Sequence, residues 1–550
     1  MASCMKQLVL LTSPFLLMTS YFVTAGSVIL AVLLVLLSRP VLAETDLPHP
    51  TYTWSLSPES GDWNTPANWN PAGVPDTQAE NAAFGSSSIT NITALGVTVR
   101  SVQFEPGASQ YTINGSLYLH REGVFNLSGV VQTFNGGDFG FSKGATAGDL
   151  VVYNATSSIS FSDGGDPATA TFNLTNGASF SGGPSAITTG GSATFYNSGG
   201  TISFRKLTNA GSATFINYGG TAFGEPGAGI DFTRSNAASS TIILYGSNVF
   251  GSLGARLSFD KSSAASATLI ANGGTGGVRS GASILFTNSD GNTARVEVFG
   301  NGNIDFSREG VADNTIGSLE GNGVVYLGAG TLAIGGNNIN TTFAGTITEH
   351  GGVHQGGPGS ISKTGTGTLT LTSPNDYSAG TTVESGSLFV NNTSGSATGS
   401  GPVSVAGGIL AGAGIITGPL NVGTGSGSGA TLAPGAGSST IGTLTVKTAL
   451  SFQADATYDM QLSSTALAAD DVTTDGIAIM NRAKIMLTDF GATTLASGTS
   501  FTVINNTSAA ATVGTFSNLG DRGTITLGTN TYQANYEGGD GNDLTLTVVP

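Results

Sequence analysis

The stretch that most constrains the fold is residues 363–390, KTGTGTLTLTSPNDYSAGTTVESGSLFV, because it holds three short apolar runs within thirty residues. Leu369 and Leu371 lie two residues apart among threonines, and Leu388 and Val390 repeat this spacing after a shorter middle run. Period-two alternation places the aliphatic side chains on one face and Thr or Ser on the other. Turn-forming residues separate the runs. Three short strands with turns predict one coil of a parallel β-helix, and one coil needs stacked neighbours to bury its inner face.

The same stretch resembles the autotransporter-associated β-strand repeat. The matching positions are Gly365, Gly367, Thr368, Leu369, Leu371, Asn375, Tyr377, Gly380, Thr381, Val383, Gly386, Leu388 and Val390. The resemblance implies an all-β, right-handed parallel β-helix on a bacterial surface or outside the cell. It implies no particular reaction.

Composition supports a β-rich, exported chain. Only 9% of the 550 residues are charged, whereas roughly a quarter is usual, so ordinary helices with charged outer faces are disfavoured. The 83 glycines suit many tight turns, and the 39% hydrophobic share is enough for a core. The net charge of -16 disfavours nucleic acid and anionic membranes as partners. The single cysteine, Cys4, lies near the N-terminus, so the rest of the chain forms no disulfide.

Residues 1–43 have the pattern of an export signal. Lys6 precedes a long uncharged run that ends before Arg39. We predict cleavage between Ala43 and Glu44, where a small residue precedes the break. The alternative is an uncleaved N-terminal anchor, since the run is long enough to span a bilayer, and the protein would then be periplasmic.

Residues 44–100 contain all three tryptophans, Trp54, Trp63 and Trp69, in a turn-rich context. We predict an N-terminal cap whose indoles cover the open end of the first coil. An uncovered end would expose apolar strands and unpaired backbone. The alternative is a platform on which sugars stack.

Residues 101–316 contain a degenerate repeat. Its markers, Thr171, Thr194, Thr214, Thr241 and Thr268, begin similar apolar segments and are 23, 20, 27 and 27 residues apart. A unit of this length matches one coil, so the chain without its leader would form roughly 20 coils. At about 4.8 Å per coil, the body would be about 100 Å long.

Two details of these repeats carry further predictions. Phe172, Phe195 and Phe215 recur at coil spacing, which favours an aromatic stack inside the coils. Residues 198–204 and residues 218–223 each contain a Gly-Gly turn and then an alternating segment. This pattern predicts a second strand in each of these coils.

Two sections complete the predicted organisation. Residues 317–447 are the region that resembles the autotransporter-associated repeat, and residues 448–550 form a β-rich closing section. The resemblance implies a membrane barrel beyond such a section, and no barrel pattern is seen before Pro550. The expectation is a passenger-like chain that lacks the C-terminal membrane barrel, either naturally or by truncation.

The main alternative function is enzymatic, since polysaccharide-cleaving enzymes share the β-helix fold. Asp470 and Asp471 form an acidic pair, but His350 precedes them. Arg482 and Lys484 follow the pair with no intervening histidine, which does not match the order of a pectin-type hydrolase. We predict no catalytic residues.

Two possible metal sites are also weak. His350 and His354 lie among glycines, which favours a loop over a helical metal pair. Residues 538–543 resemble a single calcium-binding nonapeptide, whereas such sites need tandem copies. We therefore predict a corner turn there, and neither a metal site nor a cofactor.

The sequence thus predicts an exported, cell-surface or extracellular β-helical protein with a structural or adhesive role and no enzymatic activity. Surface glycans or other cells are the expected partners, nucleic acid is not, and contact with a membrane is expected only through an uncleaved N-terminal segment. The alternative is a secreted carbohydrate-binding or polysaccharide-degrading β-helix. Oligomeric state is left open.

Overall fold

The computed structural model describes residues 52–182, 192–309, 313–354, 356–427, 429–435 and 440–550. They belong to one compact unit, Pro50–Pro550. The predicted signal sequence, with Ala43 and Glu44, lies outside the described residues. The described chain is all-β, and its only helical elements are two single 3₁₀ turns, η2 (Pro66–Asn68) and η3 (Ser307–Glu309). The prediction of an all-β fold is confirmed.

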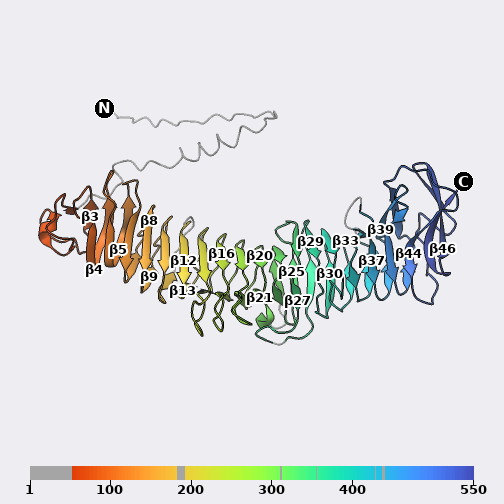
Figure 1. Cartoon of the computed structure of the whole chain (residues 1–550), viewed down its shortest axis with the longest axis horizontal. Coiled ribbons are helices and arrows are strands. Elements are labelled where there is room, and N and C mark those ends of the chain that lie inside the picture. Colours follow the sequence, from red (N-terminus) through yellow and green to blue (C-terminus); the bar gives the residue numbers. More distant parts are fainter. Residues whose placement is uncertain (1–51, 183–191, 310–312, 355, 428, 436–439) are drawn as a thin grey trace, which may run out of the picture. The chain divides into compact units, whose positions relative to one another are not determined.

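The strands are stacked in parallel ladders, and the chain returns to the first ladder once in each coil (Figure 1). The first ladder consists of β6 (Gln132–Gly136), β8 (Val151–Ala155), β10 (Thr171–Leu174), β12 (Thr194–Ser198), β14 (Thr214–Tyr218), β16 (Thr241–Leu244), β18 (Thr268–Ala271), β20 (Arg295–Val298), β23 (Ser318–Gly321), β26 (Thr341–Phe343), β29 (Thr368–Leu371), β31 (Ser387–Val390), β33 (Gly408–Gly412), β36 (Ala430–Pro434), β39 (Ala456–Ser463) and β43 (Lys484–Asp489).

Two further ladders complete the coils. The second consists of β7 (Phe139–Ser142), β9 (Ser158–Phe161), β11 (Ser179–Gly182), β13 (Thr201–Arg205), β15 (Gly229–Thr233), β17 (Arg256–Asp260), β19 (Ser283–Thr287), β21 (Asn303–Asp305), β24 (Val324–Tyr326) and β27 (Thr346–Thr348). The third consists of β22 (Asn314–Ile316), β25 (Thr331–Ile334), β28 (Ser360–Lys363), β30 (Gly380–Val383), β32 (Val403–Val405), β35 (Leu420–Val422), β38 (Leu450–Phe452) and β42 (Ile477–Ile479). These stacked parallel sheets are consistent with the predicted solenoid.

Other strands begin and end the stack. At the N-terminal end lie β1 (Tyr52–Trp54), β2 (Trp69–Asn70), β3 (Asn81–Phe84), β4 (Asn91–Phe104) and β5 (Thr112–Asn126). At the C-terminal end a seven-stranded sheet holds β34 (Ile415–Ile416), β37 (Thr443–Val446), β41 (Asp471–Thr474), β44 (Ser500–Asn506), β45 (Thr524–Leu527), β46 (Asn530–Gly538) and β47 (Asp543–Val549), while β40 (Ala468–Ala469) pairs with β39. The last three strands of that sheet are antiparallel, so the parallel ladder stops there.

The register of the first ladder confirms the spacing predicted from the threonines. Thr171 pairs with Thr194, Thr194 with Thr214, Thr214 with Thr241, and Thr241 with Thr268. Each marker therefore stands at the same position of consecutive coils, although the intervals differ by seven residues. The strands keep the register, and the connections absorb the difference in length.

The coils of residues 101–316 are filled by two stacks of aromatic rings. Phe172, Phe195 and Phe215 lie 4.8 Å apart with nearly parallel planes, which confirms the predicted stack. On the facing ladder, Phe204 and Phe232 begin a second stack at 4.8 Å, and it continues through Phe259, Phe286 and Phe306. All of these rings are buried. Parallel, in-register strands bring each ring over its counterpart one coil away, which produces the stacks.

An asparagine ladder accompanies the first coils. Asn114, Asn135, Asn154 and Asn173 occupy matching positions on β5, β6, β8 and β10, and Asn91 on β4 lies two residues before the partner of Asn114. Each side-chain Nδ2 donates to the Oδ1 of the preceding asparagine, over 2.6 to 3.1 Å. The ladder satisfies polar groups between coils and opposes a register slip.

Two strand predictions need correction. Residues 363–390 do not hold three strands of one coil, because Thr368 pairs with Ser387 and β31 already belongs to the next coil. Only β30 lies between these two positions, and the second-ladder position is occupied by a loop. Residues 221–223 are not a strand either, and Phe223 is 77% exposed, because ten residues at 219–228 form a loop before β15.

The tryptophan-rich section packs its indoles inward. Trp54, Trp63 and Trp69 are at most 3% exposed, and all three contact the ring of Phe84. Each indole N–H donates to a backbone carbonyl. No indole face is open, so this cluster is not a sugar platform. That residues 44–100 form a cap stays a prediction, as do the other section boundaries, the coil number and the handedness.

Side-chain amides cover backbone groups near the C-terminal end. Asn518 accepts from Ile485 N at 2.9 Å and donates to Ile485 O at 2.7 Å. Asn530 likewise accepts from Leu495 N and donates to Thr493 O, both at 2.8 Å. These amides make the hydrogen bonds that a further strand would make.

Candidate functional site

The repeat motif at residues 363–390 is mostly an interior structure. Its apolar positions Leu369, Leu371, Val383, Leu388 and Val390 are all buried. Each points inward because alternation in β29, β30 and β31 places threonine, serine and Phe389 outward. The motif therefore specifies how coils stack.

The motif glycines lie where coils approach closely. Gly386 has φ of +64°, and a Cβ there would lie 2.4 Å from Gly365 O and 2.5 Å from Gly367 O. No side chain fits at that contact, and the left-handed backbone favours glycine in any case. Gly365, Gly367 and Gly380 occupy similarly tight positions. The spacing of glycines in the motif thus follows the corners of the coil.

Lys363, the basic residue that opens the motif, is buried at such a corner. It is 1% exposed, and its Nζ donates to Thr364 O at 2.6 Å and to Gly365 O and Ser385 O, both at 3.3 Å. Burial lowers the pKa of Lys363 to about 8. The ammonium ties together carbonyls from two successive coils, and Gly365 O also accepts from Ser385 Oγ at 3.1 Å.

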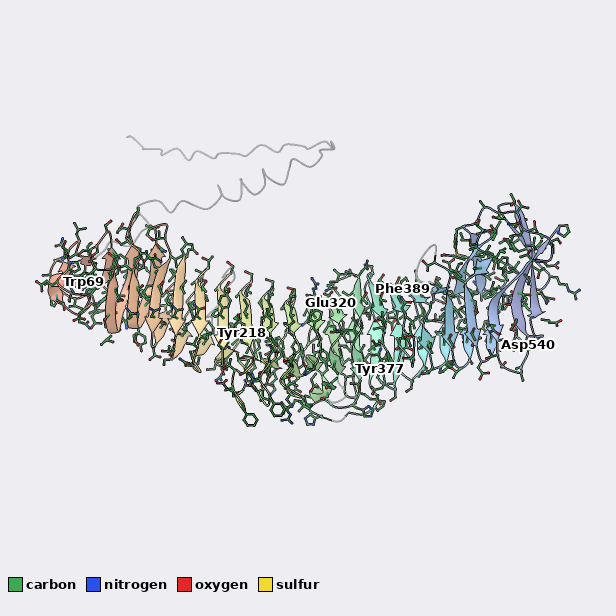
Figure 2. The ribbon with its side chains drawn as sticks, in the orientation of Figure 1. Trp69, Tyr218, Glu320, Tyr377, Phe389 and Asp540 are labelled. Atoms are coloured by element: carbon green, nitrogen blue, oxygen red, sulfur yellow. The ribbon has the colours of Figure 1, made fainter. Side chains whose placement is uncertain are left out.

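Asn375, Tyr377 and Thr381 form a polar network inside the same coil. Tyr377 is fully buried, and its hydroxyl lies 2.7 Å from Thr381 Oγ1. Asn375 accepts from Ile347 N at 2.7 Å and donates to Ala397 O at 2.5 Å, which joins the coil to both neighbours. Burial raises the pKa of Tyr377 well above its usual value. Figure 2 labels Tyr377 within the stacked coils. The described repeat positions are thus spread over successive coils and lie mainly in the interior.

The acidic pair considered for catalysis is enclosed. Asp470 is 1% exposed, and its two oxygens accept from Gly442 N and Gln461 N, both at 2.9 Å. Burial raises its pKa to about 6, and burial also raises the pKa of Asp471. These contacts describe a carboxylate that joins adjacent segments of the coil.

The basic residues once compared with a hydrolase lie elsewhere. Arg482 and Lys484 line a groove of 460 Å³ together with Asp455, whose carboxylate accepts from the backbone of Thr424, Gly425 and Gly427. Asp470 and Asp471 are not among the residues that line this groove. The structure therefore does not bring the acidic pair and the two cations together there.

The other candidate sites have structural roles. His350 and His354 lie in an irregular segment that Asp305 and Ser307 hold through the backbone of Val353 and His354. Residues 538–543 form the predicted turn before the last strand, and this turn joins β46 and β47 as a hairpin. Within the described ranges, no group of three or more His, Cys, Asp or Glu side chains could hold a metal ion. Over those same residues, no helix combines the length and the apolar character needed to span a membrane.

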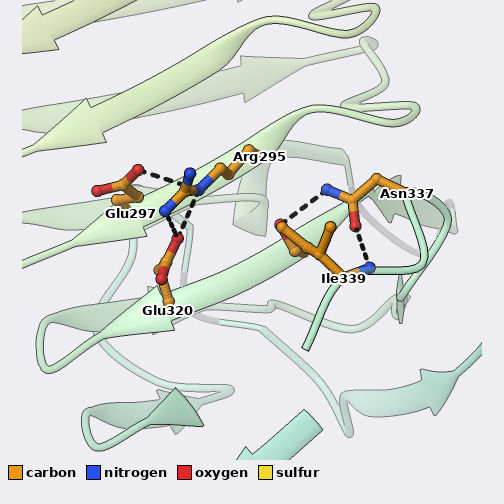
Figure 3. A network of polar contacts seen from close by, with 6 residues as sticks. Arg295, Glu297, Glu320, Asn337 and Ile339 are labelled. Atoms are coloured by element: carbon orange, nitrogen blue, oxygen red, sulfur yellow. Dashed lines mark hydrogen bonds and ion pairs between the residues drawn. The ribbon is translucent and has the colours of Figure 1, made fainter. Parts of the chain in front are cut away.

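The outer face of the first ladder carries a charged network (Figure 3). Glu297 and Glu320 face each other in register, and like charges in that arrangement repel. Arg295 contacts both carboxylates, at 3.1 Å and 2.5 Å. Burial of Glu297 is the main cause of its raised pKa. The arginine offsets the repulsion at this step.

Sequence analysis missed a set of long loops and a groove at their base. The loops span residues 219–228, 245–255 and 272–282 and project from consecutive coils between the first and second ladders (Figure 1). The groove has a volume of 540 Å³ and is lined by residues that include Tyr218 and Tyr245. One signal in the sequence could have indicated these loops. Tyr218 and Tyr245 are 27 residues apart, as are Phe223 and Phe250, and both pairs lie in glycine-rich segments.

Comparison with known proteins identifies the repeat. A family model described as the passenger-associated-transport-repeat matches residues 361–390. The chain contains a repeat of the autotransporter passenger type. This passenger repeat begins in β28 and includes β29, β30 and β31, so the match falls on the buried positions described above.

A curated relative extends this similarity. The chain is 38% identical over 110 residues to the protein named "Adhesin BmaC autotransporter" of Brucella suis biovar 1 (strain 1330). The alignment covers 19% of this chain and 3% of that relative, so the chain spans a small part of the relative's length. Together the two comparisons indicate a passenger-type repeat protein similar to an adhesin.

Proposed function

We propose that this protein is exported to the bacterial cell surface, where it acts as an adhesin-like β-helical solenoid without enzymatic activity. The observation that carries the proposal is the passenger repeat at residues 361–390, whose interior positions build the coils. The partial similarity to an autotransporter adhesin supports the same compartment and role. Export would follow from residues 1–43, with cleavage between Ala43 and Glu44.

The mechanism is interfacial. Inward positions are mainly apolar and hold the coils in register, while outward positions present Thr, Ser and Asn side chains together with Tyr196, Ile216 and Tyr218. Repetition of weak contacts along such a surface gives avidity without a deep pocket. Surface glycans or other cells are the partners that this surface suits. The handedness, the cap at residues 44–100 and the closing section 448–550 belong to the same proposal.

Two measurements on the native host test this function. Protease treatment of intact cells, followed by detection with an antibody against residues 101–316, should degrade the protein, and the N-terminal residue should be Glu44. Deletion of the gene should reduce attachment of cells to a glycan-coated surface, with restoration by the plasmid-borne gene. Recovery from the inner membrane with Met1 intact, or unchanged attachment after deletion, would contradict the proposal.

A further inference from the structure

The three long loops form one rigid layer, here called the ledge and defined as residues 219–228, 245–255 and 272–282. Backbone hydrogen bonds join loop to loop: Gly220 N donates to Leu253 O at 2.9 Å, and Ser247 N donates to Ser280 O at 2.7 Å. Their glycines allow this approach, since a Cβ at Gly246 would lie 2.5 Å from the backbone of the next loop. The ledge is therefore held in place before any ligand arrives, which lowers the entropy cost of binding.

Two tyrosines stand where the ledge meets the coils. Tyr218 is the last residue of β14, and Tyr245 occupies the equivalent position one coil later (Figure 2 labels Tyr218). Their rings are stacked, with centroids 5.5 Å apart and planes 9° from parallel. They are 37% and 41% exposed and line the 540 Å³ groove. This volume lies within the range of small-ligand sites.

The polar groups of this groove are available. In the part of the chain that the structure describes, the hydroxyls of Tyr218 and Tyr245 make no hydrogen bond. Ser198 adds a hydroxyl to the lining, and Asn248 adds its Nδ2 group, since its Oδ1 already accepts from Thr275 N and Thr275 Oγ1. Each phenol can donate one hydrogen bond and accept others, so the groove offers both roles beside an aromatic surface. Exposed tyrosine with small polar neighbours is a common composition for adaptable recognition surfaces.

Charge defines the ligand further. No Asp, Glu, Lys, Arg or His is among the described residues that line the groove, although the chain carries a net charge of -16. Glu225, within the ledge, is bound by Thr221 N, Thr221 Oγ1 and Ala222 N and does not line the groove. A charged ligand would find no counter-ion here, whereas an uncharged ligand rich in hydroxyls would find donors, acceptors and ring surface.

We propose that the Tyr218–Tyr245 groove binds an uncharged glycan. A sugar ring lies with its C–H face against the exposed tyrosine surface, and its hydroxyls bond to the phenols, Ser198 and Asn248. This inference deepens the proposed adhesin-like function by naming its ligand class and site. The proposal also gives the ledge a function. Its loops form the wall of the groove, and without them the sheet would present an open face.

The test measures binding of defined oligosaccharides to the purified full chain by isothermal titration calorimetry. The probes are the neutral hexamers of α-1,4-glucose, β-1,4-glucose and β-1,4-xylose, with a hexamer of galacturonic acid as the charged comparator. We expect at least one neutral hexamer to bind and the acidic one not to bind. Tyr218→Ala and Tyr245→Ala should each weaken that binding by about tenfold or more.

Two variants serve as controls. Tyr118 on β5 is 38% exposed, which matches the groove tyrosines, and Tyr118→Ala should leave binding unchanged. Tyr245→Phe keeps the ring and should lose less affinity than Tyr245→Ala. Circular dichroism of every variant should match the parent chain.

Three results would overturn the proposal: no binding of any neutral hexamer, equal loss in the Tyr118→Ala variant, or binding of a protein partner at the groove in place of a glycan. Its failure is distinguishable from failure of the proposed function. Surface display with attachment that is insensitive to Tyr218→Ala and Tyr245→Ala would reject the groove alone. Glycan binding by a protein that never reaches the cell surface would reject the adhesin-like role alone.

Discussion

The coils that contain the aromatic stacks and the coils of the passenger repeat differ in length and in the side chains that fill their interior. Between β14 and β16 the chain takes 27 residues to return to the same position, whereas between β29 and β31 it takes 19. The longer coils contain stacked phenylalanines and support the ledge. The shorter one contains aliphatic side chains with a buried tyrosine and lysine. In this solenoid, coil length and surface features vary independently of strand register.

The largest expected effect comes from removing a ring within a stack. Phe195→Ala should destabilise its coils by about 4 kcal/mol, because it leaves a cavity between two rings that each lie 4.8 Å away. Leu388→Ala in the passenger repeat should cost about 3 kcal/mol. Hydrogen exchange of β10, β12 and β14 should report the first loss locally, since coils contact mainly their neighbours. Tyr196→Ala, beside Phe195 but exposed, is the control, and equal losses from these two changes would contradict an interior stack.

A second comparison concerns tight corners. Gly386→Ala should destabilise the passenger repeat by about 3 kcal/mol, since it combines an unfavourable φ with contacts to two carbonyl oxygens. Gly177→Ala, at φ of +80° in the turn between β10 and β11, has no atom near its Cβ and should cost only about 1 kcal/mol. Urea denaturation followed by hydrogen exchange measures both. If Gly386→Ala destabilises the protein no more than Gly177→Ala does, the backbone around residue 386 moves enough to relieve the contact between the new Cβ and the two carbonyl oxygens.

The two regions should also differ in their response to pH. Lys363 loses its proton near pH 8 when folded and near 10.5 when unfolded, so unfolding takes up a proton between these values. Stability of the passenger repeat should therefore rise by about 2 kcal/mol from pH 8 to 10 and stay level below pH 8. Amide hydrogen-exchange rates in β28 to β31, corrected for the intrinsic pH dependence of exchange, measure this change of stability with pH. Lys363→Met should remove it, and a slope that persists in that variant would assign the effect to another group.

The smallest expected effect is on the outer surface. Arg295→Gln leaves Glu297 and Glu320 facing each other without the arginine and should cost less than about 1 kcal/mol, because the arginine is nearly half exposed. Adding Glu320→Gln should recover most of that loss. Thermal denaturation at low and high salt provides the measurement. A loss that salt does not reduce would point to lost packing instead of charge.

The sequence allowed the stacking to be predicted because strand registry leaves a periodic trace. Thr194 and Thr214 each come directly before a phenylalanine of the repeat, so the interval between them equals the length of one coil. The passenger motif was likewise visible, since Leu369 and Leu388 alternate with threonine in short runs. Local alternation and turn residues are the signals that survive without an alignment.

What could not be predicted depends on contacts between coils. Residues 221–223 alternate like a strand, but no partner strand lies at that position, and Phe223 projects from a loop instead. The run at 388–390 looked like part of the coil before it, because sequence distance alone does not show which strands pair. The groove at Tyr218 and Tyr245 combines residues 27 apart and needs both the register and the ledge to exist.

The side-chain amides near the C-terminal end have a consequence for solubility. A parallel ladder is a template, and an uncovered last strand could recruit a strand from another molecule and so start a fibre. Asn518 occupies both hydrogen-bonding groups of Ile485, and the antiparallel hairpin of β46 and β47 reverses the direction of the sheet that follows β44. An incoming chain would have to displace bonds that are already made. These bonds oppose growth of the stack by addition of another copy at this end.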